Sequence, residues 1–146
     1  MDRNPRALAI CVAALTAGLL LVGVVSATPL RHVIQATPPA IAVLLLLRNV
    51  RWAPYAALAI CLFWLLIMSL IWLYLLGLAR IVTGTFTPSE TVLTFVIGAA
   101  SLLGIAVVLR ARPRTTLASG VLGFVCFALL QVAATWLSVQ PFAEHR

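Results

Sequence analysis

Few side chains in this sequence are of types that carry out acid–base, nucleophilic or metal chemistry. Of 146 residues, three are acidic and two are histidines. Cys11, Cys61 and Cys126 lie in separate apolar runs, without a CxxC pair or a nearby histidine. Because metal sites need clustered ligands, we expect these thiols to be small, inert core side chains. The chain also lacks an HExxH motif, a catalytic triad pattern and a phosphate-binding glycine loop. We therefore expect no enzyme and no resident cofactor or metal.

Glu90 has the most informative local context. In Thr87-Pro88-Ser89-Glu90, a threonine cap, a proline at the first helical position and a glutamate at the third predict a capping box. The carboxylate would also face the positive end of the helix dipole. Some small transporters couple protons through one membrane glutamate, and this is the alternative for Glu90. Its place at a helix mouth favours the structural role.

Gln131 is the most polar side chain deep in an apolar run. An unpaired amide in hydrocarbon costs several kcal/mol, so Gln131 must bond to a neighbouring helix, a backbone carbonyl or a partner chain. The alternative is that it lines a polar path. No charged residue lies deep in any run, and this argues against a proton pump or a charge-coupled carrier.

His32 and His145 are both expected at the outer side of a membrane. A bis-histidine haem usually needs ligands on facing helices inside the membrane. We expect His32 to be an interfacial side chain, and a haem or pigment ligand is its alternative role.

The composition indicates that the helices that position these residues lie in lipid rather than in water. Hydrophobic residues make up 64% and charged residues 9%, whereas soluble domains are about half apolar and about a quarter charged. A span needs roughly 20 apolar residues. We predict an all-α integral membrane protein, a single polytopic domain over 1–146. Its five transmembrane helices are expected near 7–25, 33–53, 54–79, 91–109 and 117–139. The first is interpreted as an uncleaved helix rather than a signal peptide, because its apolar run is long.

The second helix is expected to be short and broken by proline. Thr37-Pro38-Pro39 lies inside its run, and a proline within a helix removes one backbone bond and clashes with the preceding turn. A helix starting at Thr37 and continuing to Ala53 is one reading, with residues 31–36 as an outer segment before it.

All ten basic residues are arginines, and their distribution predicts orientation. With the N-terminus inside and the C-terminus outside, seven arginines lie inside and three outside, in agreement with the positive-inside rule. The chain is then a multi-pass protein of the inner (plasma) membrane. Orientation explains these arginines better than nucleic-acid binding does. A second role for the inner ones is binding to anionic lipid; the residues are Arg48, Arg51, Arg110, Arg112 and Arg114.

Small residues spaced by four, as in Ala14/Gly18, Ala100/Gly104 and Ser119/Gly123, let helix backbones approach closely. We therefore expect the first, fourth and fifth helices to form the tight core. The third helix is bulky on every face, so we expect Trp64 and Trp72 to face lipid, another membrane subunit or a second copy of the chain.

Two functions follow from the missing chemistry. The first is a structural or accessory subunit within a larger membrane protein complex. The second is a small homo-oligomeric carrier or channel, similar in size and helix count to half-length members of the drug/metabolite transporter superfamily. That similarity is one of architecture alone. It implies a path lined by Gln35, Gln131 and the Pro38-Pro39 pair. An enzyme acting on lipid or quinone is a weaker third hypothesis.

Overall fold

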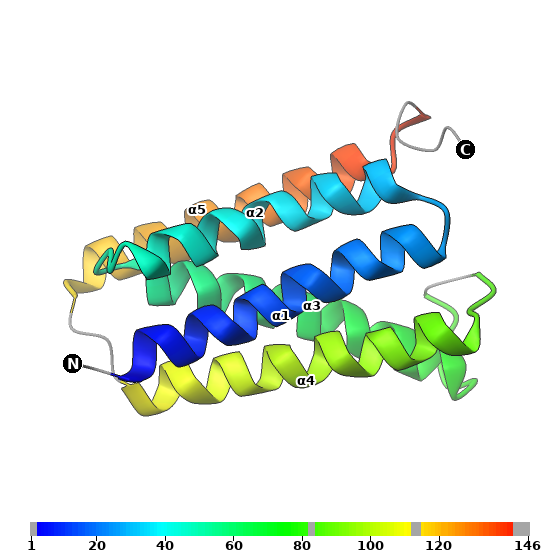
Figure 1. Cartoon of the computed structure of the whole chain (residues 1–146), viewed down its shortest axis with the longest axis horizontal. Coiled ribbons are helices and arrows are strands. Elements are labelled where there is room, and N and C mark those ends of the chain that lie inside the picture. The colour runs from blue at the N-terminus through cyan, green and yellow to red at the C-terminus, as the bar shows by residue number, and fades with distance from the viewer. Residues whose placement is uncertain (1–2, 82–83, 112–114, 142–146) are drawn as a thin grey trace.

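The computed structural model describes residues 3–81, 84–111 and 115–141, and all regular elements in these ranges are α-helices. Five long helices run side by side along the long axis (Figure 1). Their bounds are α1 Arg3–Val25, α2 Pro29–Leu47, α3 Ala53–Leu75, α4 Pro88–Ala111 and α5 Leu117–Ser138.

All five helices are long and apolar enough to cross a membrane. The shortest, α2, has 19 residues, and at 1.5 Å per residue it reaches about 29 Å, close to the thickness of a hydrocarbon core. Hydrocarbon offers no partners to backbone N–H and C=O groups, and an α-helix pairs these groups with one another. The architecture is that of a multi-pass membrane protein.

The helices form a closed ring rather than a row. Around the ring, α1 packs against α2, α2 against α5, α5 against α3, α3 against α4, and α4 against α1. Helix α3 also contacts α1 and α2 across the ring, so it packs against each of the other four helices within the described residues. Successive helices alternate in direction, and the two ends of the chain lie at opposite ends of the bundle (Figure 1).

The expectation that α1, α4 and α5 form the tight core is correct for α1 and α4, which pack closely against each other, and wrong for α5. Neither α1 nor α4 packs extensively against α5 in the described part of the chain. Helix α3 instead packs against both α4 and α5. Its first half is lined with small residues that allow close approach; Ala53, Ala56 and Ala57 are fully buried. Trp64, expected at the surface, is 4% exposed.

Trp72 is half-buried and packs against α4. Its indole Nε1 donates a 3.0 Å hydrogen bond to Oγ1 of Thr94 on α4. The ring stacks on Phe95 with centroids 5.3 Å apart. A β-carbon added at Gly98 would clash with the ring. The small residues of α4 therefore accept the bulky side chains of α3.

Helix α5 receives α3 in the same way. A β-carbon at Gly123 would lie 2.8 Å from the ring of Trp52, and that ring lies 6.1 Å from the ring of Phe127. The small residues identified in the sequence do mark close contacts, but their partner is the bulky helix.

The expected break in the second helix is absent, because α2 runs without interruption through Pro38 and Pro39. It begins with Thr28 at the N-cap position and Pro29 in its first turn, eight residues before Thr37. It ends at Leu47 and does not continue to Ala53. Asn49, with φ 54°, takes the left-handed conformation that stops it.

The same type of turn follows three of the helices. After α1, α2 and α3, a residue with positive φ turns the chain; these residues are Ala27, Asn49 and Gly77. In each case the next residue's N–H bonds back to a carbonyl in the last helical turn, as in Thr28 N to Gly23 O at 2.9 Å. This pattern is a Schellman motif. Between α1 and α2 the whole connection consists of Ser26–Thr28.

Candidate functional site

Three of the buried polar residues described in the spans lie where α2 meets α5, and the other two, Thr94 and Ser101, lie on α4. The amide Nε2 of Gln35 donates a 2.8 Å hydrogen bond to Oγ of Ser138. Nε2 of Gln131 donates a 3.3 Å bond to the backbone oxygen of Gln35. Gln131 and Ser138 are fully buried, and Gln35 is 5% exposed. We call Gln35, Gln131 and Ser138 the polar seam.

The prolines explain why Gln131 bonds to that particular carbonyl. In an α-helix the N–H of residue i bonds to the carbonyl of residue i−4, and Pro39 has no N–H. The carbonyl of Gln35 therefore loses its partner within α2. Gln131 of α5 supplies the missing donor. Thus a proline pair that would weaken an isolated helix is accommodated by a neighbouring one.

One polar atom of the seam has no partner. The side-chain oxygen Oε1 of Gln131 is buried and accepts no hydrogen bond from the described residues. An amide oxygen in this position recognises an N–H or O–H donor. The seam therefore combines a helix with weakened internal bonding and one free acceptor.

Thr87 and Glu90 form reciprocal hydrogen bonds at the start of α4. The backbone N–H of Thr87 donates to Oε2 of Glu90 at 2.7 Å, and the N–H of Glu90 donates to Oγ1 of Thr87 at 3.3 Å. Ser89 Oγ lies 3.1 Å from Thr87 Oγ1. Glu90 lies at a helix end rather than along a helix interior, so its carboxylate acts as a cap here.

His32 lies in the first turn of α2 and against α1. Its Nδ1 is 3.1 Å from the backbone oxygen of Thr28 and 3.2 Å from the hydroxyl of the same residue. A β-carbon at Gly23 would lie 2.6 Å from Cβ of His32. The ring is thus fixed at the α1–α2 turn, while His145 falls outside the described residues.

The three cysteines are free. A β-carbon at Gly104 would lie 2.7 Å from Sγ of Cys61 and 3.7 Å from Cβ of Cys11, so these two side chains share one notch in α4. Cys126 is exposed on α5. In the described ranges no three His, Cys, Asp or Glu residues are grouped so that they could hold a metal ion.

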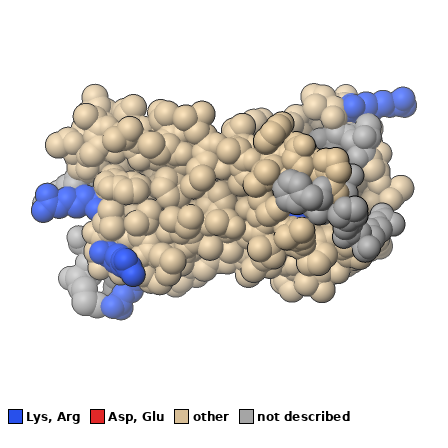
Figure 2. Space-filling view, turned by 90° about the horizontal axis from the view of Figure 1, so that it is seen from above, with Lys and Arg blue, Asp and Glu red and all other residues tan. Residues whose placement is uncertain are grey.

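The predicted lipid-binding arginines gather at one end of the bundle. Chain direction places the start of α1 with the α2–α3 and α4–α5 connections (Figure 1). Four arginines there are exposed, and we call them the arginine end: Arg6, Arg48, Arg51 and Arg110. Arg112 and Arg114 lie outside the described residues. Figure 2 shows blue side chains toward the two ends of one face and an uncharged surface between them.

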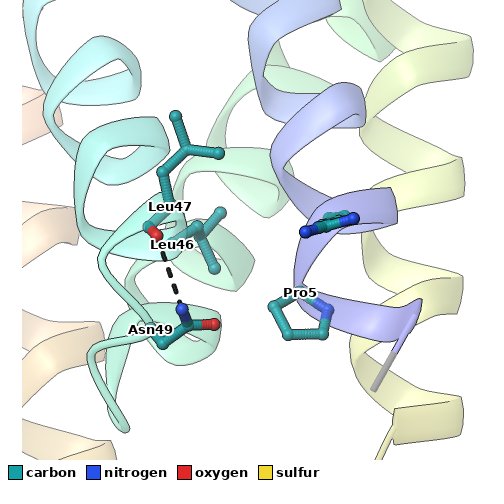
Figure 3. Close-up of a pocket in the computed structure, with 5 residues that line it drawn as sticks. Pro5, Leu46, Leu47 and Asn49 are labelled. Carbon is teal, nitrogen blue, oxygen red and sulfur yellow. Dashed lines mark hydrogen bonds between the residues drawn. The ribbon is translucent and has the colours of Figure 1, made fainter. Parts of the chain in front are cut away.

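A pocket of about 180 Å³ opens at the arginine end between α1 and α2. Pro5 and Arg6 line one side. The last turn of α2 and the residue that stops it, Leu46, Leu47 and Asn49, line the other (Figure 3). The only hydrogen bond drawn there runs from Nδ2 of Asn49 to the carbonyl of Leu47 and is 3.5 Å long.

Sequence reasoning singled out Gln131 but not Ser138, and it considered Gln35 only as part of a path. A signal for Gln35 was present, because a proline four residues after it removes the donor from its carbonyl. Ser138 gives no such signal. Its role depends on which helix lies beside α5.

Comparison with known proteins adds no relative: no family model, no curated protein and no solved structure matches this chain.

Proposed function

We propose that this chain is a structural or accessory subunit of a larger membrane protein complex and performs no catalysis of its own. The support lies in how its polar groups are used. The seam joins α2 to α5, the Trp72–Thr94 bond joins α3 to α4, and Thr87 with Glu90 caps α4. Each contact stabilises the bundle.

The observation that carries the proposal is the outer face of α5. This helix packs mainly against α2 and α3, and its other face presents bulky apolar side chains at alternating spacings of three and four. Such spacing suits packing against another membrane helix. We call this row the α5 stripe: Leu122, Val125, Leu129, Val132 and Trp136. It replaces Trp64 and Trp72 as the proposed contact with a neighbouring subunit.

The test is extraction in a mild detergent followed by mass spectrometry of the intact assembly. A foreign membrane chain in stoichiometric amount is the expected result. The double substitution Leu129→Ala with Trp136→Ala should release that chain. Leu103→Ala, on the exposed face of α4, is the matched control and should retain it. If the double variant retains the foreign chain as the control does, or if no foreign chain is present at all, the proposal is wrong.

The proposed setting is the inner (plasma) membrane, with the N-terminus inside and the C-terminus outside. The arginine end then lies in the inner headgroup layer, where each arginine near the surface contributes about 1 kcal/mol of attraction to anionic lipid. We include binding of anionic lipid by Arg48, Arg51 and Arg110, with Arg112 and Arg114, in the proposed function.

A homo-oligomeric carrier or channel is the second candidate, and the polar seam favours it. Buried Oε1 of Gln131 is a free acceptor among the described residues, and it lies beside the proline-containing helix that would have to move. In this reading a neutral solute with a donor group passes between α2 and α5.

Light scattering of proteoliposomes under an osmotic step of glycerol or urea tests this second candidate. A carrier predicts faster swelling than protein-free vesicles show, and Gln131→Leu should abolish the difference. Equal rates in all three preparations would contradict it.

A further inference from the structure

We propose that the pocket between α1 and α2 binds the headgroup of an anionic glycerophospholipid. Its lining is divided by chemistry. Arg6 offers a fixed positive charge, and Asn49 offers amide hydrogens. Leu46, Leu47 and Pro5 supply an apolar wall. A guanidinium matches the geometry of phosphate oxygens and forms two parallel hydrogen bonds with them.

The donors of the pocket are available. Arg6 and Asn49 are both exposed. Asn49 Nδ2 donates one bond of 3.5 Å within the protein, which leaves its second amide hydrogen free for a ligand. Its left-handed backbone ends α2, and its side chain is part of the pocket lining.

The charge around the pocket suits an anion. The described side chains at this end include four exposed arginines, Arg6, Arg48, Arg51 and Arg110, and no acidic one. Arg48 and Arg51 follow α2 directly. An anion in the pocket therefore experiences attraction from more than the one side chain that touches it.

The pocket continues into a surface that suits acyl chains. Leu47, in the lining, is 60% exposed. One turn further into the membrane on the same faces lie Ile10 of α1, 69% exposed, and Leu44 of α2, 58% exposed. A phosphate at Arg6 with hydrocarbon along Ile10 and Leu44 matches the order of groups in a phospholipid. An acidic protein segment would leave these exposed apolar side chains without a partner.

This inference rests on the proposed placement of the arginine end in an anionic headgroup layer. The test titrates the full-length protein with dioleoyl-phosphatidylglycerol, or with dioleoyl-phosphatidylcholine, and counts bound lipid by native mass spectrometry. We expect phosphatidylglycerol to be retained in preference, and Arg6→Gln to weaken it about fivefold. Arg6→Lys should retain most of the binding. Arg80→Gln, at the opposite end of the bundle, should change nothing.

Asn49→Gly provides a second variant, since glycine tolerates the positive φ of this position. It should weaken lipid binding without altering the fold. An excess of inorganic phosphate, or of polyglutamate, should fail to displace the lipid. Displacement by phosphate would show an anion site without lipid selectivity, and displacement by polyglutamate would show a site for acidic protein. Either result overturns the proposal.

The arginine variants separate this pocket from the broader lipid-binding surface. If Arg6→Gln and Asn49→Gly bind as tightly as the wild type while Arg48→Gln with Arg51→Gln binds weakly, the pocket assignment is wrong and the proposed lipid face stands. If none of these variants loses phosphatidylglycerol, both fail.

Discussion

Pro39 and Gln131 act on the same atom from different helices. The proline removes the donor that the carbonyl of Gln35 would have within α2, and the glutamine restores one from α5. Residues that depend on each other in this way are energetically coupled. The contribution of Gln131 to the free energy of unfolding should therefore depend on whether residue 39 has an N–H.

We expect Gln131→Leu to lower the free energy of unfolding by about 1 kcal/mol, the usual size of such a bond between membrane helices. In a Pro39→Ala background, the backbone supplies the N–H that the carbonyl of Gln35 lacks, so the same substitution should cost at most roughly half as much. Unfolding in mixed detergent and dodecyl sulfate micelles, followed by circular dichroism, measures all four proteins of the cycle. Equal costs in both backgrounds would show that the two residues are independent.

Glu90 gives a prediction that separates charge from hydrogen bonding. Glu90→Gln retains an acceptor for the N–H of Thr87 and should cost only the charge–dipole part, about 0.3–1 kcal/mol. Glu90→Ala also removes the acceptor and should cost more, up to about 2 kcal/mol. The same unfolding measurement checks this order. Neither variant should alter transport, if any is found, and loss of proton-coupled transport with intact assembly would contradict the capping role.

Helix α4 works as a groove for α3. Gly98 faces the ring of Trp72, which is fixed by Thr94 and Phe95, and Gly104 faces the sulfur of Cys61. The indole cannot turn aside without losing both its hydrogen bond and its stacking contact.

Gly98→Ala should therefore lower the free energy of unfolding by about 1–2 kcal/mol, even though alanine is the better helix former. Ala99→Leu is the matched control. Ala99 is the next residue and is exposed, so a larger side chain there should change stability by less than about 0.5 kcal/mol. A Gly98→Ala variant as stable as the wild type would mean that α3 and α4 are less closely packed than described.

The sequence predicted the number of helices and the approximate place of each, because length and apolar composition determine which segments can cross hydrocarbon. It could not predict which helices pack against one another. In water, apolar side chains mark the buried face, but in lipid both faces of a helix are apolar. Thus the bulk of Trp64 and Trp72 was interpreted as a surface feature. The glycines that receive α3 are more than 20 residues away in sequence.

The polar seam was only partly predictable for a related reason. Polarity alone indicates that Gln131 needs a partner in hydrocarbon. The identity of that partner depends on the order of the helices around the ring. This order places α2 and α5 side by side although 96 residues separate Gln35 from Gln131. The break at Pro38-Pro39 was mispredicted because the rule that proline disrupts a helix considers that helix alone. The donor that the carbonyl of Gln35 lacks within α2 comes from Gln131 on α5.

At the scale of the whole molecule, the alternation of five helices gives a test of topology. Single cysteines introduced as Arg51→Cys and Thr115→Cys lie in the α2–α3 and α4–α5 connections, and Gly84→Cys lies in the α3–α4 connection. In a chain whose three native cysteines are replaced by alanine, a membrane-impermeant maleimide should label the first two positions from one side and the third from the other. The proposed orientation places Arg51 and Thr115 inside. Labelling of these two positions from opposite faces would contradict the five-span arrangement.

The three-residue turn between α1 and α2 affects the order in which the molecule can be assembled during synthesis. The most apolar stretch of α2 is less apolar than that of any other span, whereas that of α1 is strongly apolar, and only Ser26–Thr28 joins the two helices. We therefore expect them to insert into the membrane as one hairpin, with the strongly apolar helix favouring insertion of the weaker one. The donor that Gln35 needs is still missing at that moment, since α5 emerges from the ribosome last. The nascent protein thus carries an unpaired carbonyl through most of its translation, until its final helix inserts beside α2.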